Sequence, residues 1–285
     1  MPDATMVDSA SNPASAGLRF DLLEKLEASL RQMGSVAIAF SGGVDSRFLV
    51  HAALRAGADV LALHAAGPHI PRREEAYAEA WAARRGITMR VFAFDPLMIS
   101  ALSTNPKDRC YYCKKALYST MLEHAGERPL LDGSNASDLG EHRPGLKALD
   151  ELRIMSPMLR LGITKADIRH LGAATDLHDP GQAAQPCLMT RFAYGLHLNA
   201  AWLSAVDAGE EAAGRILSNC GLNPVPPFRL RAISAEKTAL HIGVSVLSED
   251  MRVSIARELS NEGFPQIEIE ALPSLSGYFD RLVTQ

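Results

Sequence analysis

The stretch SVAIAF-SGGVDS at positions 35–46 joins a short apolar run to a helix through a loop with two adjacent glycines. The run 35–40 is typical of a fully buried strand, and the apolar residues of 46–54 recur at helical spacing. Glycines let the backbone approach a ligand closely, and a helix N-terminus adds a partial positive charge at the same place. The segment therefore predicts a cradle for a phosphate-sized anion.

This loop is not a Walker loop, because no Gly-Lys-Ser/Thr follows at the required spacing. It resembles the SGGxDS loop of the PP-loop ATP pyrophosphatases, which cleave ATP between the α- and β-phosphates and adenylate a substrate oxygen. A simpler interpretation is a Gly-Gly turn before a helix that Asp45 caps. The strand, both serines and the aspartate together favour nucleotide binding. The predicted ATP-binding residues of the loop are Phe40, Ser41, Gly42, Gly43, Asp45 and Ser46.

Length and composition indicate an ordinary globular protein. The 285 residues leave room for two domains, and 47% are hydrophobic and 22% charged. The net charge of −4 gives no broad basic surface for nucleic acid. No apolar run is long enough to cross a bilayer, and residues 1–16 are predicted to be a disordered tail and not a signal peptide. Four cysteines are too few for a disulfide scaffold, so we expect a reducing, cytoplasmic setting.

Strand and helix signals alternate through residues 17–197, which we predict to form one α/β domain with a parallel sheet sandwiched by helices. Ligands of such sheets bind beyond the carboxyl ends of the strands. The loop at 40–46, His64 and Gly133 should converge there, and both single residues are candidates for ATP binding. Further strands are predicted at 59–63, 88–94 and 129–133, and helices at 72–85 and 110–125.

The pattern of predicted helices and strands changes at residue 198. From there we predict a smaller α+β domain, 198–285, for substrate binding or oligomerisation. A long helix is predicted at 199–220 and is followed by a proline-rich segment. A second helix is predicted at 248–262, with Ser248 as its N-cap. Three strands are predicted at 228–233, 238–244 and 266–271.

The cysteines allow several interpretations. Cys110 and Cys113 lie three apart at the start of a predicted helix, and Cys187 follows a proline in an irregular segment. A zinc site would need a fourth ligand, for which Cys220 or a histidine is available. A redox dithiol would need only the first pair, and three thiolates could hold a 4Fe–4S cluster with one iron open. Simple packing of small buried side chains is the remaining alternative. The helix N-terminus and nearby Arg191 favour low thiol pKa values and thus a chemical role.

Four segments together are similar to one family, the LarE-type ATP-dependent sulfur transferases of nickel-pincer nucleotide synthesis. The similarity runs from about Leu18 to the C-terminus. It is carried by SGGVDS at 41–46, YYCKK at 111–115, DGSNASD with RPGLKA at 132–148, and PC with RFAYG at 186–195.

That resemblance implies that ATP and Mg²⁺ adenylate a carboxylate of a pyridinium dicarboxylate mononucleotide, and that a sulfur donor then displaces AMP to leave a thiocarboxylate. Cys187 matches the sacrificial cysteine of some members, which becomes dehydroalanine. Cys110 and Cys113 depart from that pattern and resemble members with three cysteines and a cluster, so we favour a 4Fe–4S cluster on all three. Asp45 is the expected Mg²⁺ partner, with an N-cap role as the alternative. Adenylation removes the negative charge that repels a nucleophile and supplies a leaving group.

Further charged residues are candidates for binding the acceptor. Arg229 and Arg231 lie two apart on a predicted strand, so both point to one face and could clamp a phosphate. A solvated strand face is the equally weighted alternative. Glu210 matches an acidic position near the family's substrate phosphate or metal, and would otherwise be an exposed helix carboxylate. Lys114, Arg143 and Arg191 lie inside the matched segments.

Three competing functions fit less well. A tRNA thiolase of the PP-loop superfamily commonly adds zinc-finger cysteines and basic surfaces, and an amide-forming synthetase would need an ammonia source. A non-catalytic nucleotide-binding regulator would leave the three cysteines without a purpose. The expected partners are a small nucleotide acceptor and sulfide or another sulfur donor, and we expect a homo-oligomer with no membrane or nucleic-acid partner.

Overall fold

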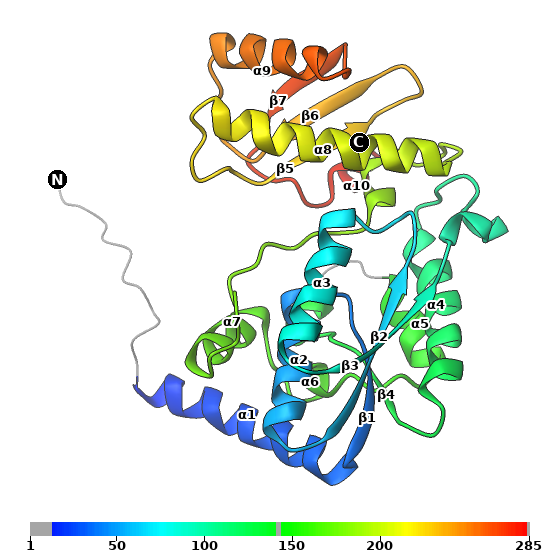
Figure 1. The fold of residues 1–285 in the computed structure, drawn as a ribbon, viewed down its shortest axis with the longest axis vertical. Coiled ribbons are helices and arrows are strands. Elements are labelled where there is room, and N and C mark those ends of the chain that lie inside the picture. The colour runs from blue at the N-terminus through cyan, green and yellow to red at the C-terminus, as the bar shows by residue number, and fades with distance from the viewer. Residues whose placement is uncertain (1–12, 141–143, 284–285) are drawn as a thin grey trace. The chain divides into compact units, whose positions relative to one another are not determined.

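A computed structural model describes residues 13–140 and 144–283 (Figure 1). These residues form two compact units whose segments are interleaved along the chain. The first unit holds the described residues up to Ala65 together with Tyr77–Phe92 and Leu117–Ala184. The second holds Ala66–Ala76, Ala93–Ala116 and the described residues from Gln185 onward. Residues 198–283 of the predicted second domain thus lie in the second unit, which also includes Ala66–Ala76, Ala93–Ala116 and residues 185–197 of the predicted first domain.

The first unit contains the predicted parallel sheet. Its strands are β1 (Ser35–Ala39), β2 (Asp59–Ala66), β3 (Thr88–Ala93) and β4 (Leu130–Leu131), in the order β3-β2-β1-β4. Strand β1 is central and pairs in parallel with β2 from Ser35↔Asp59 to Ala39↔Leu63, and with β4 at Ile38↔Leu131. The apolar run predicted as a buried strand is confirmed, because four of the five residues of β1 are buried.

Helices flank this sheet, as predicted, with α2 and α3 on one side and α4 and α5 on the other in Figure 1. Their apolar faces enclose a core that includes Trp81, Phe48 and Leu26. Helix α7 starts with a capping box, in which the Thr164 side chain accepts from the Asp167 N–H and the Asp167 carboxylate accepts from the Thr164 N–H. The helices of this part of the chain are α1 (Pro13–Met33), α2 (Val44–Arg55), α3 (Arg72–Arg84), α4 (Arg109–Ala125), α5 (Pro144–Glu151), α6 (Pro157–Arg160) and α7 (Lys165–Ala174).

Helix α1 begins at Pro13, inside the segment 1–16 that we expected to be a disordered tail. Residues 1–12 of that segment lie outside the described residues. None of the helices in 13–140 and 144–283 is both long enough and apolar enough to cross a membrane.

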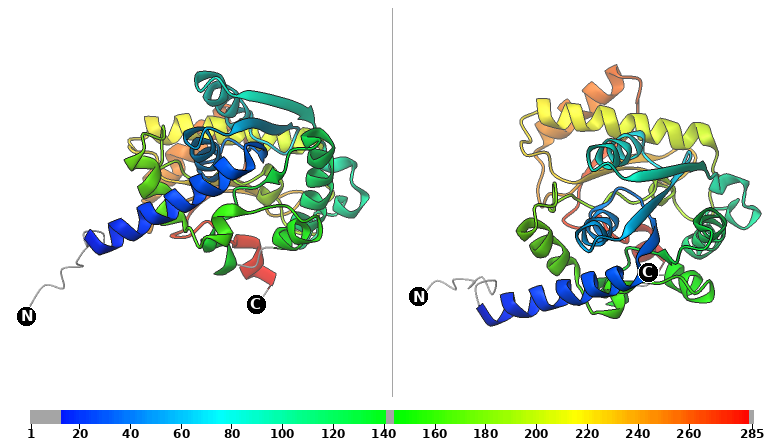
Figure 2. Two further views of the ribbon diagram at one scale, coloured as in Figure 1. Left: turned by 90° about the horizontal axis from the view of Figure 1, so that it is seen from below. Right: turned by 60° about the horizontal axis from the view of Figure 1, so that its bottom comes forward.

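The second unit is built on a mixed three-stranded sheet, β5-β6-β7. Strand β5 (Phe228–Ala232) runs antiparallel to β6 (Thr238–Ile242), which pairs in parallel with β7 (Ile267–Ala271). Helices α8 (Ala200–Asn219) and α9 (Glu249–Asn261) pack on each other and on this sheet, as Figures 1 and 2 show. The Ser248 side chain accepts from the Met251 N–H, so the predicted cap of α9 is confirmed. The second unit also contains the short α10 (Tyr278–Val283) and the 3₁₀ turns η2 (Pro96–Met98), η3 (Ser100–Leu102) and η5 (Leu188–Arg191). A further 3₁₀ turn, η4 (Ala136–Gly140), lies in the first unit.

Candidate functional site

The loop between β1 and α2 is held by its own serines. Ser46 donates from Oγ to the carbonyl of Gly43 at 3.0 Å, and the two hydroxyls of Ser41 and Ser46 lie 3.3 Å apart. The Gly43 N–H donates to Ser41 Oγ at 3.3 Å. Gly43 is the N-cap of α2, so the alternative in which Asp45 caps this helix is wrong. Asp45 lies in the first helical turn instead, where a carboxylate also suits the helix dipole.

Two glycines of this region stand where a side chain would not fit. Gly42 has φ +79°, and a Cβ added there would lie 2.7 Å from Cβ of Ala78 on α3. Gly133 follows β4, and its added Cβ would lie 3.1 Å from the backbone N of Ser46. The structure therefore brings Gly133 against the loop, as the parallel topology predicts for the carboxyl ends of β1 and β4.

Asp45 makes an ion pair that the sequence analysis missed. Its Oδ2 lies 2.5 Å from Nζ of Lys165, the first residue of α7, and the two side chains are 30% and 27% exposed. The second oxygen, Oδ1, is buried and has no hydrogen-bond partner among residues 13–140 and 144–283. A carboxylate oxygen held in this way suits a hard cation such as Mg²⁺, which prefers oxygen ligands.

Arg47 supports the same loop from within the first unit. Although it is fully buried, it has carbonyl and amide oxygens as partners. Its Nε donates to the Gly42 carbonyl at 2.9 Å, and Nη2 donates to the Asp179 carbonyl at 2.9 Å and to Gln182 Oε1 at 2.6 Å. Its guanidinium carbon also lies 5.9 Å from the ring centroid of Trp81. A charged residue within the apolar run of α2 was the signal that could have identified it.

The other predicted ATP residues in this unit are buried against each other. His64 is 1% exposed, and its Nδ1 lies 2.8 Å from the carbonyl oxygen of Phe40, whose ring is equally buried. The second ring nitrogen of His64, Nε2, is buried and without a partner in the part of the chain that the structure describes. Its role toward adenosine stays a prediction.

The second unit contains all four cysteines. Cys110 is exposed in the first turn of α4, Cys113 is half-buried one turn later, and Cys187 is the N-cap of η5. Cys113 and Cys187 pack against one hydrophobic core. Cys220 ends α8, with its Sγ 3.9 Å from Ser254 Oγ, and packs on that core as well.

Asn105 explains how the two cysteine segments come together. This buried residue, which precedes α4, donates from Nδ2 to the carbonyls of Phe192 and Ala193 at 3.0 and 3.1 Å. The Gly195 N–H donates to the Thr104 carbonyl at 2.9 Å and extends the contact. These bonds join the chain just before Cys110 to the chain just after Cys187. The thiols of Cys110 and Cys187 therefore lie near enough to Cys113 to influence its pKa. No local sequence pattern indicates such a contact.

The charge states of the thiols follow from this crowding. Burial, and then the neighbouring Cys187 and Cys110, raise the pKa of Cys113 to about 12. Burial also raises the pKa of Cys187, whereas Arg109 and Arg191 lower it. The expectation of low thiol pKa values is therefore wrong for Cys113 and for Cys187, because burial outweighs the helix N-terminus and the nearby arginines. Among the described residues no group of three or more His, Cys, Asp or Glu side chains is placed to hold a single metal ion.

Arg191 and Glu210, both predicted to bind substrate, are bonded to each other. The guanidinium donates through Nε and Nη2 to the two carboxylate oxygens at 2.8 and 3.0 Å. Both side chains are almost fully buried, at 1% and 3% exposed. Arg191 also donates from Nη1 to the Pro186 carbonyl at 2.9 Å. The pair therefore anchors the segment that carries Cys187.

Arg229 and Arg231 lie on β5, the strand predicted for them. Burial, and then repulsion from Arg191, lower the pKa of each to about 10. Arg231 is the more buried, and its Nη2 donates to the Leu275 carbonyl at 2.5 Å. Its guanidinium carbon also lies 4.7 Å from the ring centroid of Tyr278. A solvated strand face is therefore excluded for Arg231, and the crowding of cations favours a bound anion.

Arg109, which the sequence analysis missed, adds a further cation beside Cys110. It is 8% exposed, and its Nε and Nη1 are buried without hydrogen-bond partners among the residues described. Its guanidinium carbon lies 4.8 Å from the ring centroid of Tyr194. Lys114, in the next turn of α4, offsets a small part of the rise in the pKa of Cys113. Arg143 lies outside the described residues.

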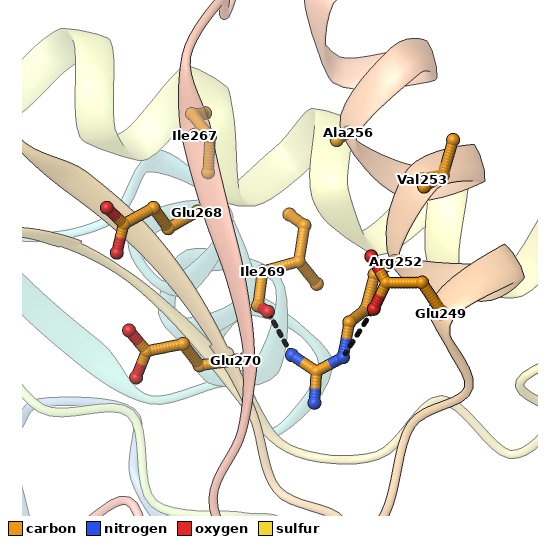
Figure 3. Close-up of a pocket in the computed structure, with 8 residues that line it drawn as sticks. All are labelled: Glu249, Arg252, Val253, Ala256, Ile267, Glu268, Ile269 and Glu270. Carbon is orange, nitrogen blue, oxygen red and sulfur yellow. Dashed lines mark hydrogen bonds and ion pairs between the residues drawn. The ribbon is translucent and has the colours of Figure 1, made fainter.

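A cavity of about 360 Å³ in the second unit lies away from these residues in the sequence, between α9 and β7 (Figure 3). Arg252 reaches across it to the carbonyl of Ile269 and lies 3.9 Å from Glu249. Glu268 and Glu270 of β7 also line it. None of the predicted site residues lines this cavity.

A parallel sheet with a Gly-Gly loop between its central strand and the following helix defines an α/β protein with a PP-loop-like fold. No family model matches the chain. It is 31% identical over 269 residues, 91% of this chain and 94% of the other, to the pyridinium-3,5-bisthiocarboxylic acid mononucleotide synthase of Lactiplantibacillus plantarum. The chain belongs to the family of that synthase.

Two other relatives are uncharacterised proteins. One, from Synechocystis, is 32% identical over 192 residues, which are 66% of this chain and 72% of the relative. The other, from Methanocaldococcus jannaschii, is 29% identical over 195 residues, which are 66% of this chain and 74% of the relative.

Proposed function

We propose that the protein is an ATP-dependent sulfur transferase that converts a carboxylate of a pyridinium dicarboxylate mononucleotide into a thiocarboxylate. One observation carries this proposal. The chain that matches the synthase over 91% of its length also gathers Cys110, Cys113 and Cys187 in one unit. The family relation supports the acceptor and the product, and the gathered thiols support sulfur transfer.

The first step is adenylation of the acceptor carboxylate. A carboxylate oxygen attacks the α-phosphate of ATP, the α–β bridging bond breaks, and pyrophosphate leaves. The loop at 41–46 would bind the leaving phosphates through backbone N–H groups and the α2 N-terminus. Asp45 Oδ1, buried and without a partner among the described residues, fits a Mg²⁺ ion. That ion, when bound, would neutralise charge on the phosphates. Lys165 keeps the carboxylate of Asp45 oriented through Oδ2.

The second step is displacement of AMP by sulfur. The donor set of Cys110, Cys113 and Cys187 fits a 4Fe–4S cluster, because three thiolates bind three different irons and need not converge on one point. A bound cluster would supply one iron for an exogenous sulfide. Burial raises the pKa of Cys187, and Arg109 and Arg191 offset part of that rise and so would support its thiolate. The acceptor phosphate would bind Arg229 and Arg231, whose mutual repulsion an anion relieves.

Cys187 itself is the alternative sulfur source. In that case its thiolate attacks the acyl carbon and AMP leaves. The Cβ–S bond then breaks as a base removes the Cα proton, which leaves dehydroalanine on the chain and the thiocarboxylate on the product. The two routes predict different masses for the protein after turnover.

The experiment that tests this proposal uses anaerobically purified full-length protein. Incubation with ATP, Mg²⁺, sulfide and the acceptor should yield AMP, pyrophosphate and the thiocarboxylate. ADP and orthophosphate as main products would refute the adenylation step. A brown, iron-containing protein of unchanged mass after several turnovers would support the cluster, whereas a loss of H₂S from Cys187 after one turnover would support sacrifice. Cys220→Ser is the matched control for Cys110→Ser, because Cys220 packs at the end of α8 and should not affect iron content.

A further inference from the structure

The segment that carries Cys187 is a turn closed by hydrogen bonds of its own backbone. Cys187 caps η5, and its carbonyl accepts from the Thr190 N–H at 3.0 Å and from Thr190 Oγ1 at 2.7 Å. The Leu188 N–H donates to the His69 carbonyl at 2.8 Å. These bonds fix the backbone on the C-terminal side of the thiol.

Arg191 holds this turn from both sides of Cys187. Its Nη1 donates to the carbonyl of Pro186, the residue before the cysteine, at 2.9 Å. The same Nη1 donates to Thr190 Oγ1 at 3.0 Å, the hydroxyl that holds the cysteine carbonyl. A guanidinium presents its donors in a rigid plane, so one side chain sets the separation of the two ends of the turn.

Glu210 in turn fixes Arg191 to the frame of the second unit. It lies on the buried face of α8 and takes Arg191 Nε and Nη2 in a two-pronged contact. Its Oε1 also accepts from the Leu230 N–H of β5 at 3.1 Å. A helix and a strand of the sheet therefore both support the arginine.

The hydrogen bonds of this pair leave little capacity for a ligand. Arg191 donates from all three nitrogens, at 1% exposure, and Glu210 accepts at both oxygens, at 3% exposure. Opening such a buried pair to bind substrate would leave one charge unpaired. Arg231 and Arg109, by contrast, keep side-chain nitrogens that are buried without hydrogen-bond partners among the residues described.

We propose that Arg191 and Glu210 are positioning residues that fix Cys187 for sulfur transfer, and that they are not ligands of the acceptor. This inference rests on the proposed function and deepens it. Productive attack requires the sulfur and the acyl carbon to be aligned, and a misplacement of about 1 Å can reduce a rate about 100-fold. The structure explains how one cysteine on an irregular segment keeps that alignment.

The test separates the two half-reactions in the full-length protein. Arg191→Lys keeps the positive charge but loses the planar guanidinium with its several N–H donors. Glu210→Gln keeps the side-chain shape but loses the negative charge. Both should leave acceptor-dependent pyrophosphate release within about twofold of wild type and lower thiocarboxylate formation about 100-fold. A parallel fall in both steps, with a raised KM for the acceptor, would show substrate binding and overturn the proposal.

A second readout needs neither ATP nor a bound cluster. The metal-free protein is treated with iodoacetamide, and alkylation of each cysteine is followed by peptide mass spectrometry. Loosening the turn should speed modification of half-buried Cys187 about tenfold through local opening, and leave that of exposed Cys110 unchanged. Equal changes at both cysteines, or none at Cys187, would refute a local positioning role.

Two further variants keep the result interpretable. Thr190→Val removes the hydroxyl that links Arg191 to the Cys187 carbonyl but preserves side-chain shape, so it decides the question if the charged variants fail to fold. Asp207→Asn is the matched control, because Asp207 pairs with Arg72 at 3.0 Å one turn before Glu210 on α8. It should change neither readout, and an Asp207→Asn effect equal to that of Glu210→Gln would overturn the proposal. If wild type releases no acceptor-dependent pyrophosphate, the proposed function fails, and the alkylation rates still judge the positioning role.

Discussion

Gly42→Ala should destabilise the first unit and distort its loop for two separable reasons. At φ +79° an alanine adopts the left-handed region, which costs about 1–2 kcal/mol. Its Cβ would also lie 2.7 Å from Ala78 Cβ and 3.1 Å from Ala78 Cα, both on helix α3. Relieving such overpacking costs about 1–3 kcal/mol. We therefore expect a loss of about 2–5 kcal/mol in the free energy of unfolding.

Gly34→Ala is the matched control, because Gly34 has φ +71° and its added Cβ would have no described atom within 4 Å. It should lose only the backbone part, about 1–2 kcal/mol. Urea denaturation measures both variants. The difference between them is the steric part, because both substitutions change the entropy of the unfolded chain alike.

The steric part can be tested further by removing its partner. In Gly42→Ala/Ala78→Gly the 2.7 Å contact is gone, so the double variant should recover part of the stability once the cost of Ala78→Gly alone is subtracted. Calorimetric titration with a non-hydrolysable ATP analogue and Mg²⁺ should show about 10- to 100-fold weaker binding to Gly42→Ala, the effect of losing one charge-assisted hydrogen bond. Equal stabilities of Gly42→Ala and Gly34→Ala, with no coupling to Ala78, would refute the reasoning.

Three further predictions concern the side chains of His241, Arg229 and Thr164. Burial, and then Arg231, lower the pKa of His241 from 6.5 to about 4. The unfolded chain therefore binds more protons between these values, and stability should fall as the pH falls from 6.5 to 4, by up to about 3 kcal/mol, with a flatter profile in His241→Gln. Arg229→Ala should weaken binding of the phosphate-bearing acceptor about 10- to 100-fold and leave ATP affinity unchanged, whereas equal effects on both ligands would contradict a phosphate role. Thr164→Ala should lower the free energy of unfolding by about 1 kcal/mol through loss of the α7 capping box, and Thr164→Ser should not.

The fold was predictable because its signals are local. The buried run of β1, the glycines of the loop and the Ser248 cap each lie within a few residues of the structure that they determine. The alternative in which Asp45 caps α2 is wrong, although aspartate is a preferred N-cap residue. The preceding glycine takes that place, and the carboxylate turns instead to Lys165, 120 residues away in the sequence. Long-range ion pairs of this kind leave no periodic signal.

The site residues also divide into those that local sequence identifies and those that only long-range contacts reveal. Cys110, Cys113 and Cys187 were identifiable from spacing and resemblance, but the contact that gathers them is made by Asn105 across more than 80 residues. Arg47 was missed for the same reason, since its partners Asp179 and Gln182 lie more than 130 residues further along the chain. Residue type thus indicated the candidate reactive side chains. The residues that position them, such as Asn105 and Arg47, are determined by the tertiary structure.

The electrostatics of the second unit show why composition is a poor guide to such a site. The chain carries a net charge of −4, yet Arg191, Arg229 and Arg231 crowd together, and Glu210 is one of the groups that raise the pKa of the latter two. Both oxygens of Glu210 already accept hydrogen bonds from Arg191. The carboxylate therefore neutralises Arg191 first, and the repulsion between the partly buried Arg229 and Arg231 remains. This repulsion is an unfavourable contribution to the stability of the folded protein. A doubly charged phosphate would relieve it through charge-assisted hydrogen bonds to the arginines. A local excess of cations inside an acidic chain therefore favours a small anionic ligand over a polyanionic surface partner, because only the local charge has the right sign.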